Sequence, residues 1–133
     1  MNAVFQDLDD DDNPMNGTTI ATWSDIEKVI EQLRDRRPFM IQLQLEDGSK
    51  LDVGLAREIG CVQHSPIDGM PPYRMATTKT SSPMGQGDTE FSVGGTATPI
   101  DNRYCVPLPV VKLIVENSLL GRPLGNGVVW EDF

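Results

Sequence analysis

Apolar and polar residues follow their clearest pattern between residues 23 and 55, where a helical period changes to a strand period. Over residues 23–33 the apolar side chains recur at every third or fourth position, as in a helix that buries one face. They are Trp23, Ile26, Val29, Ile30 and Leu33. We predict that a capping box of Ser24 and Glu27 starts this helix, which ends before Pro38 because proline disfavours helical geometry in the preceding residue.

A β-hairpin is predicted after the helix, because apolar and polar residues alternate on both sides of Asp47-Gly48. A two-residue turn at this dipeptide would place the apolar residues of the two strands on opposite faces. A three-residue loop over 46–48, with Gly48 in the left-handed conformation, instead pairs Leu43 with Leu51. We therefore predict the three-residue loop and one apolar sheet face that packs against the helix.

The second half is rich in Pro and Gly, which predicts short strands joined by turns. The strand candidates are residues 59–64, 73–78, 90–93, 103–106 and 128–131, and residues 80–87 predict a long loop. The many β-branched residues after Pro109 are typical of a strand, but Pro109 suits a first helical turn and Gly121 suits a helix end. We predict a helix there. The expected fold class is α+β, an antiparallel sheet packed with two helices in a single domain.

The N-terminal segment is marked by a run of carboxylates at Asp7 and Asp9 to Asp12. Blocks of like charge at a chain terminus are usually solvated. We therefore expect residues 1–20 to be an acidic, flexible segment and residues 21–133 to form the folded domain, a division that suits the total of 133 residues. An acidic arm for a basic partner is the alternative.

The formal net charge is −9, which argues against direct binding to nucleic acid or to an anionic membrane, because both would repel the chain. The sequence shows no secretory signal and no apolar run approaching the ~20 residues of a membrane span. We expect a cytoplasmic protein in which Cys61 and Cys105 are reduced.

Candidate catalytic or metal-binding chemistry is confined to Cys61 and His64, with Cys105 as a conceivable third ligand. A structural zinc site usually takes four ligands, and no fourth is evident. A catalytic Cys–His pair remains an alternative, although no flanking signature accompanies it. The signature of zinc deaminases, His-x-Glu followed by Pro-Cys-x-x-Cys, is absent. We expect no metal, no cofactor and no enzymatic activity.

The order of motifs resembles the Imm1 family of bacterial immunity proteins over roughly residues 22–131. The motifs are Arg36-Arg37-Pro38, Gly60-Cys61-Val62, Gly94-Gly95, an apolar helix after Pro107, Gly121-Arg122-Pro123 and a terminal Val128-Val129-Trp130-Glu131. The family includes the immunity partners of double-stranded-DNA cytosine deaminase toxins. The resemblance implies a cytoplasmic antidote that binds a toxin domain and blocks its active site. An acidic chaperone or adaptor for a secreted effector is the alternative.

Partner-binding candidates are acidic and aromatic residues in the predicted loops, because an acidic surface is attracted to the basic cleft of a toxin that acts on nucleic acid. They are Glu46, Asp47, Asp68, Tyr73, Asp88 and Glu90. The competing interpretation is that each is an ordinary solvated residue. Trp23 and Trp130 occupy apolar positions of the pattern and are assigned to the core.

Overall fold

A large sheet is the main element of the computed structural model, which describes residues 1–77, 85–123 and 128–132, with the backbone only at residue 34. The strand order is β10-β6-β5-β4-β3-β1-β2. These strands are β1 (Ala3–Asp7), β2 (Thr19–Ile20), β3 (Phe39–Leu45), β4 (Lys50–Leu55), β5 (Ile59–Ser65), β6 (Arg74–Thr77) and β10 (Val129–Asp132). Neighbours along this order pair antiparallel. The remaining strands are β7 (Asp88–Val93) and β8 (Thr96–Asp101), which form a hairpin, and β9 (Val106–Pro107), which pairs with β5.

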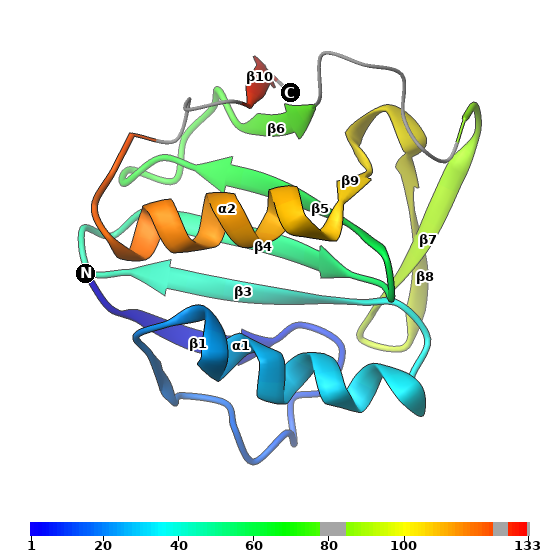
Figure 1. Cartoon of the computed structure of the whole chain (residues 1–133), viewed down its shortest axis with the longest axis horizontal. Coiled ribbons are helices and arrows are strands. Elements are labelled where there is room, and N and C mark those ends of the chain that lie inside the picture. Colours follow the sequence, from blue (N-terminus) through cyan, green and yellow to red (C-terminus); the bar gives the residue numbers. More distant parts are fainter. Residues whose placement is uncertain (78–84, 124–127, 133) are drawn as a thin grey trace.

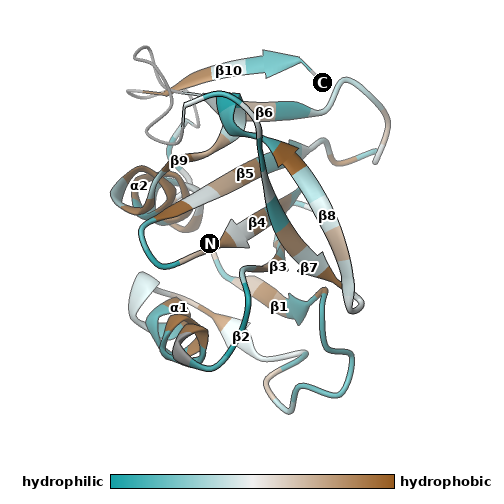
Figure 2. Ribbon diagram, turned by 90° about the vertical axis from the view of Figure 1, so that its right-hand side faces the viewer, coloured by the Kyte–Doolittle hydropathy of each residue, from teal (hydrophilic) through white to brown (hydrophobic). Residues whose placement is uncertain are grey.

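Two helices within the described residues, α1 (Trp23–Ile30) and α2 (Leu108–Leu119), lie on one face of the sheet, and the β7–β8 hairpin lies on the other (Figure 1; Figure 2). A 3-10 turn over Glu31–Arg34 continues α1. The side chains buried between helices and sheet include Phe5, Ile26, Val29, Ile41, Leu43, Leu51, Val53 and Ile114. Neither helix is long and apolar enough to cross a lipid bilayer. The predicted α+β fold, an antiparallel sheet with two helices in one domain, is confirmed.

The three-residue loop of the β3–β4 hairpin is confirmed. Leu43 pairs with Leu51 and Ile41 with Val53. Gly48 has a φ of 93°, in the region that glycine adopts at little steric cost. The apolar side chains of both strands therefore share the face that the helices cover.

Two glycines let neighbouring elements approach the sheet closely on its two faces. A Cβ atom on Gly60 would lie 2.5 Å from the carbonyl oxygen of Gly54 and 2.9 Å from Val111 of α2. A Cβ atom on Gly54 would lie 2.5 Å from the Cys61 sulfur and 2.9 Å from the ring of Phe91 in β7. Helix α2 and the β7–β8 hairpin thus pack where the sheet carries no side chain.

The predicted capping box of Ser24 and Glu27 is wrong. The helix begins at Trp23 after Thr22 as its N-cap, and the carboxylate of Asp25 accepts hydrogen bonds from the two backbone N–H groups before the helix, at 2.9 and 3.3 Å. This earlier start places Trp23 inside the first turn, where its ring is buried with the rest of the apolar stripe. Burial of the indole thus sets the start of the helix.

The strand predicted at residues 103–106 is wrong in its first part. The carboxylate of Asp101 accepts the N–H of Arg103 at 2.9 Å and starts a 3-10 turn over Asn102–Tyr104. Only Val106–Pro107 pair with β5. The side-chain bond offers the backbone an alternative to the strand ladder, which explains the turn.

The strands predicted at residues 59–64, 73–78, 90–93 and 128–131 lie within two residues of those positions, and the predicted second helix is confirmed as α2. Strands β1, β2 and β8 are not among the predicted strands. Gly121, with a φ of 71°, follows its end, and the N–H of Arg122 donates to the carbonyl of Asn117 at 2.8 Å. This is the glycine helix stop that the sequence predicts. Most of the loop predicted at residues 80–87 lies outside the described residues.

The first 20 residues are not the solvated segment that the charge pattern predicts. Strand β1 pairs with β3 from Ala3 opposite Leu45 to Asp7 opposite Ile41. Ala3 and Phe5 are buried in the core, and Asp7 is 0% exposed. The buried residues alternate along β1 and complete the apolar face of the sheet beside β3. The free energy gained by burying them outweighs the tendency of the following carboxylates to stay solvated.

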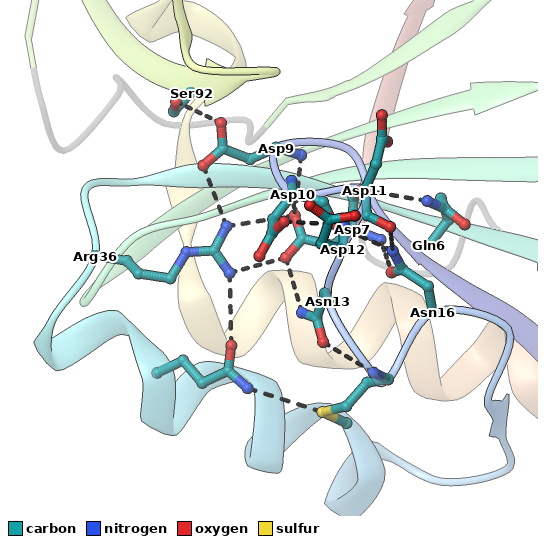
Figure 3. Close-up of polar contacts among 12 residues, drawn as sticks. Gln6, Asp7, Asp9, Asp10, Asp11, Asp12, Asn13, Asn16, Arg36 and Ser92 are labelled. Atoms are coloured by element: carbon teal, nitrogen blue, oxygen red, sulfur yellow. Dashed lines mark hydrogen bonds and ion pairs between the residues drawn. The ribbon is translucent and has the colours of Figure 1, made fainter.

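Asp7 and Asp9 belong to a charged network that we call the acidic clamp, formed by Asp7, Asp9, Asn13, Arg36 and Ser92 (Figure 3). The guanidinium of Arg36 donates to Asp7 at 2.8 Å and to Asp9 at 3.2 Å. Asn13 donates to Asp7 at 2.9 Å, and the hydroxyl of Ser92 donates to Asp9 at 2.6 Å. The clamp joins the end of β1, the connection between α1 and β3, and strand β7.

Acid should weaken the acidic clamp. Burial acts to raise the pKa of Asp7, but hydrogen bonds from Arg36 and Asn13 outweigh it and hold the pKa below the ordinary 3.8. Burial and the bonds from Ser92 and Arg36 act on Asp9 in the same way, so that its pKa is also lowered. Carboxyls with a lowered pKa stabilise the fold above their ordinary pKa, and this stabilisation is lost as the pH falls through the folded value.

We therefore expect urea titrations to show that the clamp's contribution to the free energy of unfolding is level from about pH 7 to pH 5 and declines below about pH 4. An Arg36→Met variant should show a much smaller decline, because the cation that lowers both pKa values is gone. An equal decline in the two proteins would contradict the assignment.

Candidate partner-binding surface

The residues predicted to contact a partner divide between two ends of the sheet (Figure 1). Four of them gather in the β3–β4 and β5–β6 loops: Glu46, Asp47, Asp68 and Tyr73. These loops are neighbours because β4 and β5 are antiparallel and Lys50 pairs with Ser65 beside both of them. We call this region the loop end (residues 46–49 and 64–73).

Asp88 and Glu90 lie elsewhere, on β7. This strand meets β3 where Ser92 lies beside Phe39, which is the end of β3 opposite to the loop end. Both carboxylates are exposed, and Asp88 faces Asp101 across the β7–β8 hairpin. The structure therefore does not bring these two residues together with the other four.

An open hollow of about 470 Å³ lies between the two loops of the loop end. Its described lining is Asp47, Ser49, His64, Pro66, Ile67 and Asp68. The loops approach each other beside it, because a Cβ atom added to Gly48 would lie 3.4 Å from the side chain of Ile67. The hollow thus combines two carboxylates with an apolar wall.

Asp47 is held in place and ionised by its own loop. Its carboxylate accepts from the hydroxyl of Ser49 at 2.6 Å and from the N–H of Ser49 at 2.8 Å. These bonds lower the pKa of Asp47. Burial lowers the pKa of the neighbouring His64, and Arg74 lowers it further, so the imidazole is neutral at pH 7. The hollow therefore carries negative charge at neutral pH.

Asp68 and Tyr73 brace the β5–β6 loop. The carboxylate of Asp68 accepts from the N–H of Met70 at 2.9 Å, and the hydroxyl of Tyr73 donates to the carbonyl of Gly69 at 3.0 Å. Tyr73 is half-buried, while Asp68 is exposed. Tyr73 therefore shapes the loop, and Asp68 both shapes it and presents charge.

The sequence pattern missed two residues of the loop end, Ile67 and Met70, which are 67% and 62% exposed. The sequence around them did contain a signal of their exposure. Both stand in a turn that also contains Pro66, Gly69 and a Pro71-Pro72 pair, where neither a helical nor a strand period can bury an apolar side chain. Large apolar residues in such a turn are candidates for contact with a partner.

The structure separates Cys61 from His64. They are three positions apart on β5, so their side chains point to opposite faces. Cys61 is buried beside Met40, and burial raises the pKa of its thiol to about 12. His64 lies on the helix side, with the ring of Trp130 at 6.5 Å in an edge-on contact. Across the described residues, no three His, Cys, Asp or Glu side chains are grouped to hold a metal ion.

The two tryptophans lie where the pattern predicts. The ring of Trp23 is 7% exposed in the core. Trp130 is half-buried and packs against the same core from β10. Neither is presented as a contact residue on the surface.

Comparison with known families identifies the chain as an immunity protein, a class that protects bacterial cells against toxins. The family model described as immunity protein Imm1 matches residues 15–119, and the chain belongs to that family. The match runs from just before β2 to the last residue of α2 and confirms the family that the sequence resembles, while the motifs at residues 121–123 and 128–131 lie beyond the matched range. Searches among curated proteins and among solved structures find no match.

Proposed function

We propose that the chain neutralises one cognate bacterial toxin in the cytoplasm by stoichiometric binding that occludes the active-site cleft. The proposed toxin is a domain that acts on nucleic acid, a deaminase in the resemblance described above. Membership of the Imm1 family supports a toxin as the partner. The observation that carries the mechanism is the position of Asp47 and Asp68 around one open hollow at the loop end, with Glu46 exposed in the same β3–β4 loop.

The charge of the chain suits this mechanism. A cleft that binds nucleic acid must carry positive charge to neutralise phosphates. Carboxylates at the loop end, on a chain with a formal charge of −9, are attracted to such a cleft and compete with the nucleic acid for it. Binding of this kind requires no turnover and no cofactor.

A folded toxin domain fits better than the client of a chaperone or adaptor. A chaperone for an unfolded or helical segment needs a continuous apolar groove. The large hydrophobic side chains exposed on the described residues are instead dispersed over several elements: Met1, Val4, Ile67, Met70, Leu113 and Leu120. These side chains do not form such a groove on the described residues, which favours a folded domain as the partner.

The test uses the toxin domain that co-purifies with the tagged chain from its native host at low salt. Co-expression should restore growth of a bacterial host that the toxin domain arrests, and the purified proteins should form an equimolar complex in which the toxin is inactive on its nucleic-acid substrate. A Cys61→Ala variant should protect equally well, since the thiol is fully buried and points to the sheet face opposite to His64 of the loop end. Absence of both protection and binding would refute the proposal.

Salt should separate electrostatic attraction from other modes of binding. We expect the association rate constant, measured by surface plasmon resonance, to fall steeply as sodium chloride rises from about 50 to about 300 mM, because salt screens attraction between exposed charges. A rate constant that does not depend on salt would contradict a basic cleft as the target.

A further inference from the structure

We propose that Ile67 and Met70 are the apolar anchors with which the chain docks on its toxin. They enter an apolar recess that is bordered by lysine or arginine side chains of the toxin domain. This inference rests on the proposed function and adds to it the surface of the immunity protein and the chemistry of the contact.

The exposure of the two side chains is the first argument. Ile67 and Met70 are 67% and 62% exposed, and they stand three positions apart in one loop, so a single partner surface can cover both. Leu120 is equally exposed, but no second large apolar side chain is exposed in the described part of its loop, residues 121–123 and 128, and Val4 and Leu113 are 47% and 43% exposed. Exposed apolar side chains that lie together mark sites of contact with a partner, and methionine is enriched in protein interfaces.

The loop holds its anchors in position without a partner. The N–H of Met70 donates to Asp68 at 2.9 Å, the hydroxyl of Tyr73 donates to Gly69 at 3.0 Å, and the N–H of Gly69 donates to the carbonyl of Pro66 at 3.0 Å. Ile67 lies close to the β3–β4 loop at Gly48, where an added Cβ atom would be 3.4 Å from its side chain. A braced loop loses little conformational freedom on binding, so more of the contact energy appears as affinity.

The charges beside the anchors indicate the border of the recess. Among the described residues that line the hollow beside Ile67, Asp47 and Asp68 are carboxylates and none is lysine or arginine. His64 in the same lining is neutral at pH 7 because burial lowers its pKa. Arg74, the cation that follows the loop, has a carboxylate oxygen of Asp132 at 3.7 Å. The partner that complements this surface is apolar at the centre and basic at the border.

The experiment compares two double variants by isothermal titration against the toxin domain that co-purifies with the chain, with the catalytic residue of that domain replaced. Ile67→Gln with Met70→Gln removes the anchors. Val4→Gln with Leu113→Gln makes the same chemical change at two exposed apolar positions on β1 and α2. Thermal unfolding of all proteins verifies that each variant is folded. We expect the anchor variant to weaken binding by about tenfold or more and the control variant by less than about twofold.

The outcomes distinguish the inference from the proposed function. One outcome is that the unaltered chain binds the toxin domain while the anchor variant binds equally well, or no worse than the control variant. In that case the assignment of Ile67 and Met70 as anchors is wrong and the proposed function stands. If the unaltered chain does not bind, the proposed function fails and the inference fails with it. If the unaltered chain forms a dimer that the anchor variant does not form, the loop docks on a second copy and the inference is overturned.

Discussion

Replacing Arg36 with methionine is expected to lower the free energy of unfolding by about 3 kcal/mol, near the lower limit for breaking a buried ion pair. The carboxylate of Asp7 is 0% exposed and would lose the guanidinium 2.8 Å away. The lower limit applies because the side chain of Arg36 is itself 21% exposed, so water can replace part of the lost interaction. The guanidinium also lies 3.5 Å from the centre of the Phe39 ring, and this contact would be lost with it. Urea titration at pH 7 measures the effect.

Two further variants test whether the unpaired charge is the cause. Asp11→Asn removes an exposed carboxylate of the same acidic run and should change stability by less than about 0.5 kcal/mol. Asp7→Asn combined with Arg36→Met should recover part of the loss, because no buried charge is then left without a partner. Similar losses for Asp11→Asn and Arg36→Met would show that the clamp is not a stabilising feature.

Replacing Phe91 with alanine is expected to cost about 3–5 kcal/mol, the range for a fully buried phenylalanine. Phe91 is 0% exposed and packs with Met40 and Cys61 on the sheet face that the helices do not cover. Its ring lies where Gly54 leaves room, so Gly54 itself offers no side chain to fill the cavity. The midpoint of urea unfolding should fall accordingly.

The matched control for this variant is Val93→Ala, on the same strand. Val93 is half-buried, so its truncation should cost about 1 kcal/mol. If the two variants lose stability equally, the β7–β8 hairpin is not held to the sheet by Phe91. A loss of the β7–β8 amide protection in hydrogen exchange, with the rest of the sheet protected, would show that the hairpin detaches first.

Local patterns in the sequence were sufficient for the helix and hairpin. The three-residue loop follows from the demand that Leu43 and Leu51 share a face, a constraint that involves only neighbouring residues. The second helix and its end at Gly121 follow from turn chemistry that is equally local. The order of such motifs along the chain was enough to place it in the Imm1 family.

The role of the acidic run could not be predicted from these patterns. Asp7 and Asp9 look the same in the sequence as the exposed Asp10 to Asp12, and what separates them is Arg36, 29 positions from Asp7, and Ser92, 83 positions from Asp9. A charged side chain stabilises the fold only when the fold places a partner beside it. The local sequence pattern does not show which residues far along the chain come close in space.

The candidate site shows the same division. The sequence supplied acidic residues in loops, but the strand order decided that Asp47 and Asp68 meet at one hollow while Asp88 and Glu90 stand at the other end of the sheet. The sequence also located the β5–β6 turn, whereas the exposure of Ile67 and Met70 became visible only with the surrounding loops in place.

Hydrophobic periodicity predicts which face of a helix or strand is buried. It gives no information on side chains in loops. Local secondary structure and family were therefore determined by the sequence pattern, and the grouping of charged and apolar residues into a surface was decided by the tertiary packing.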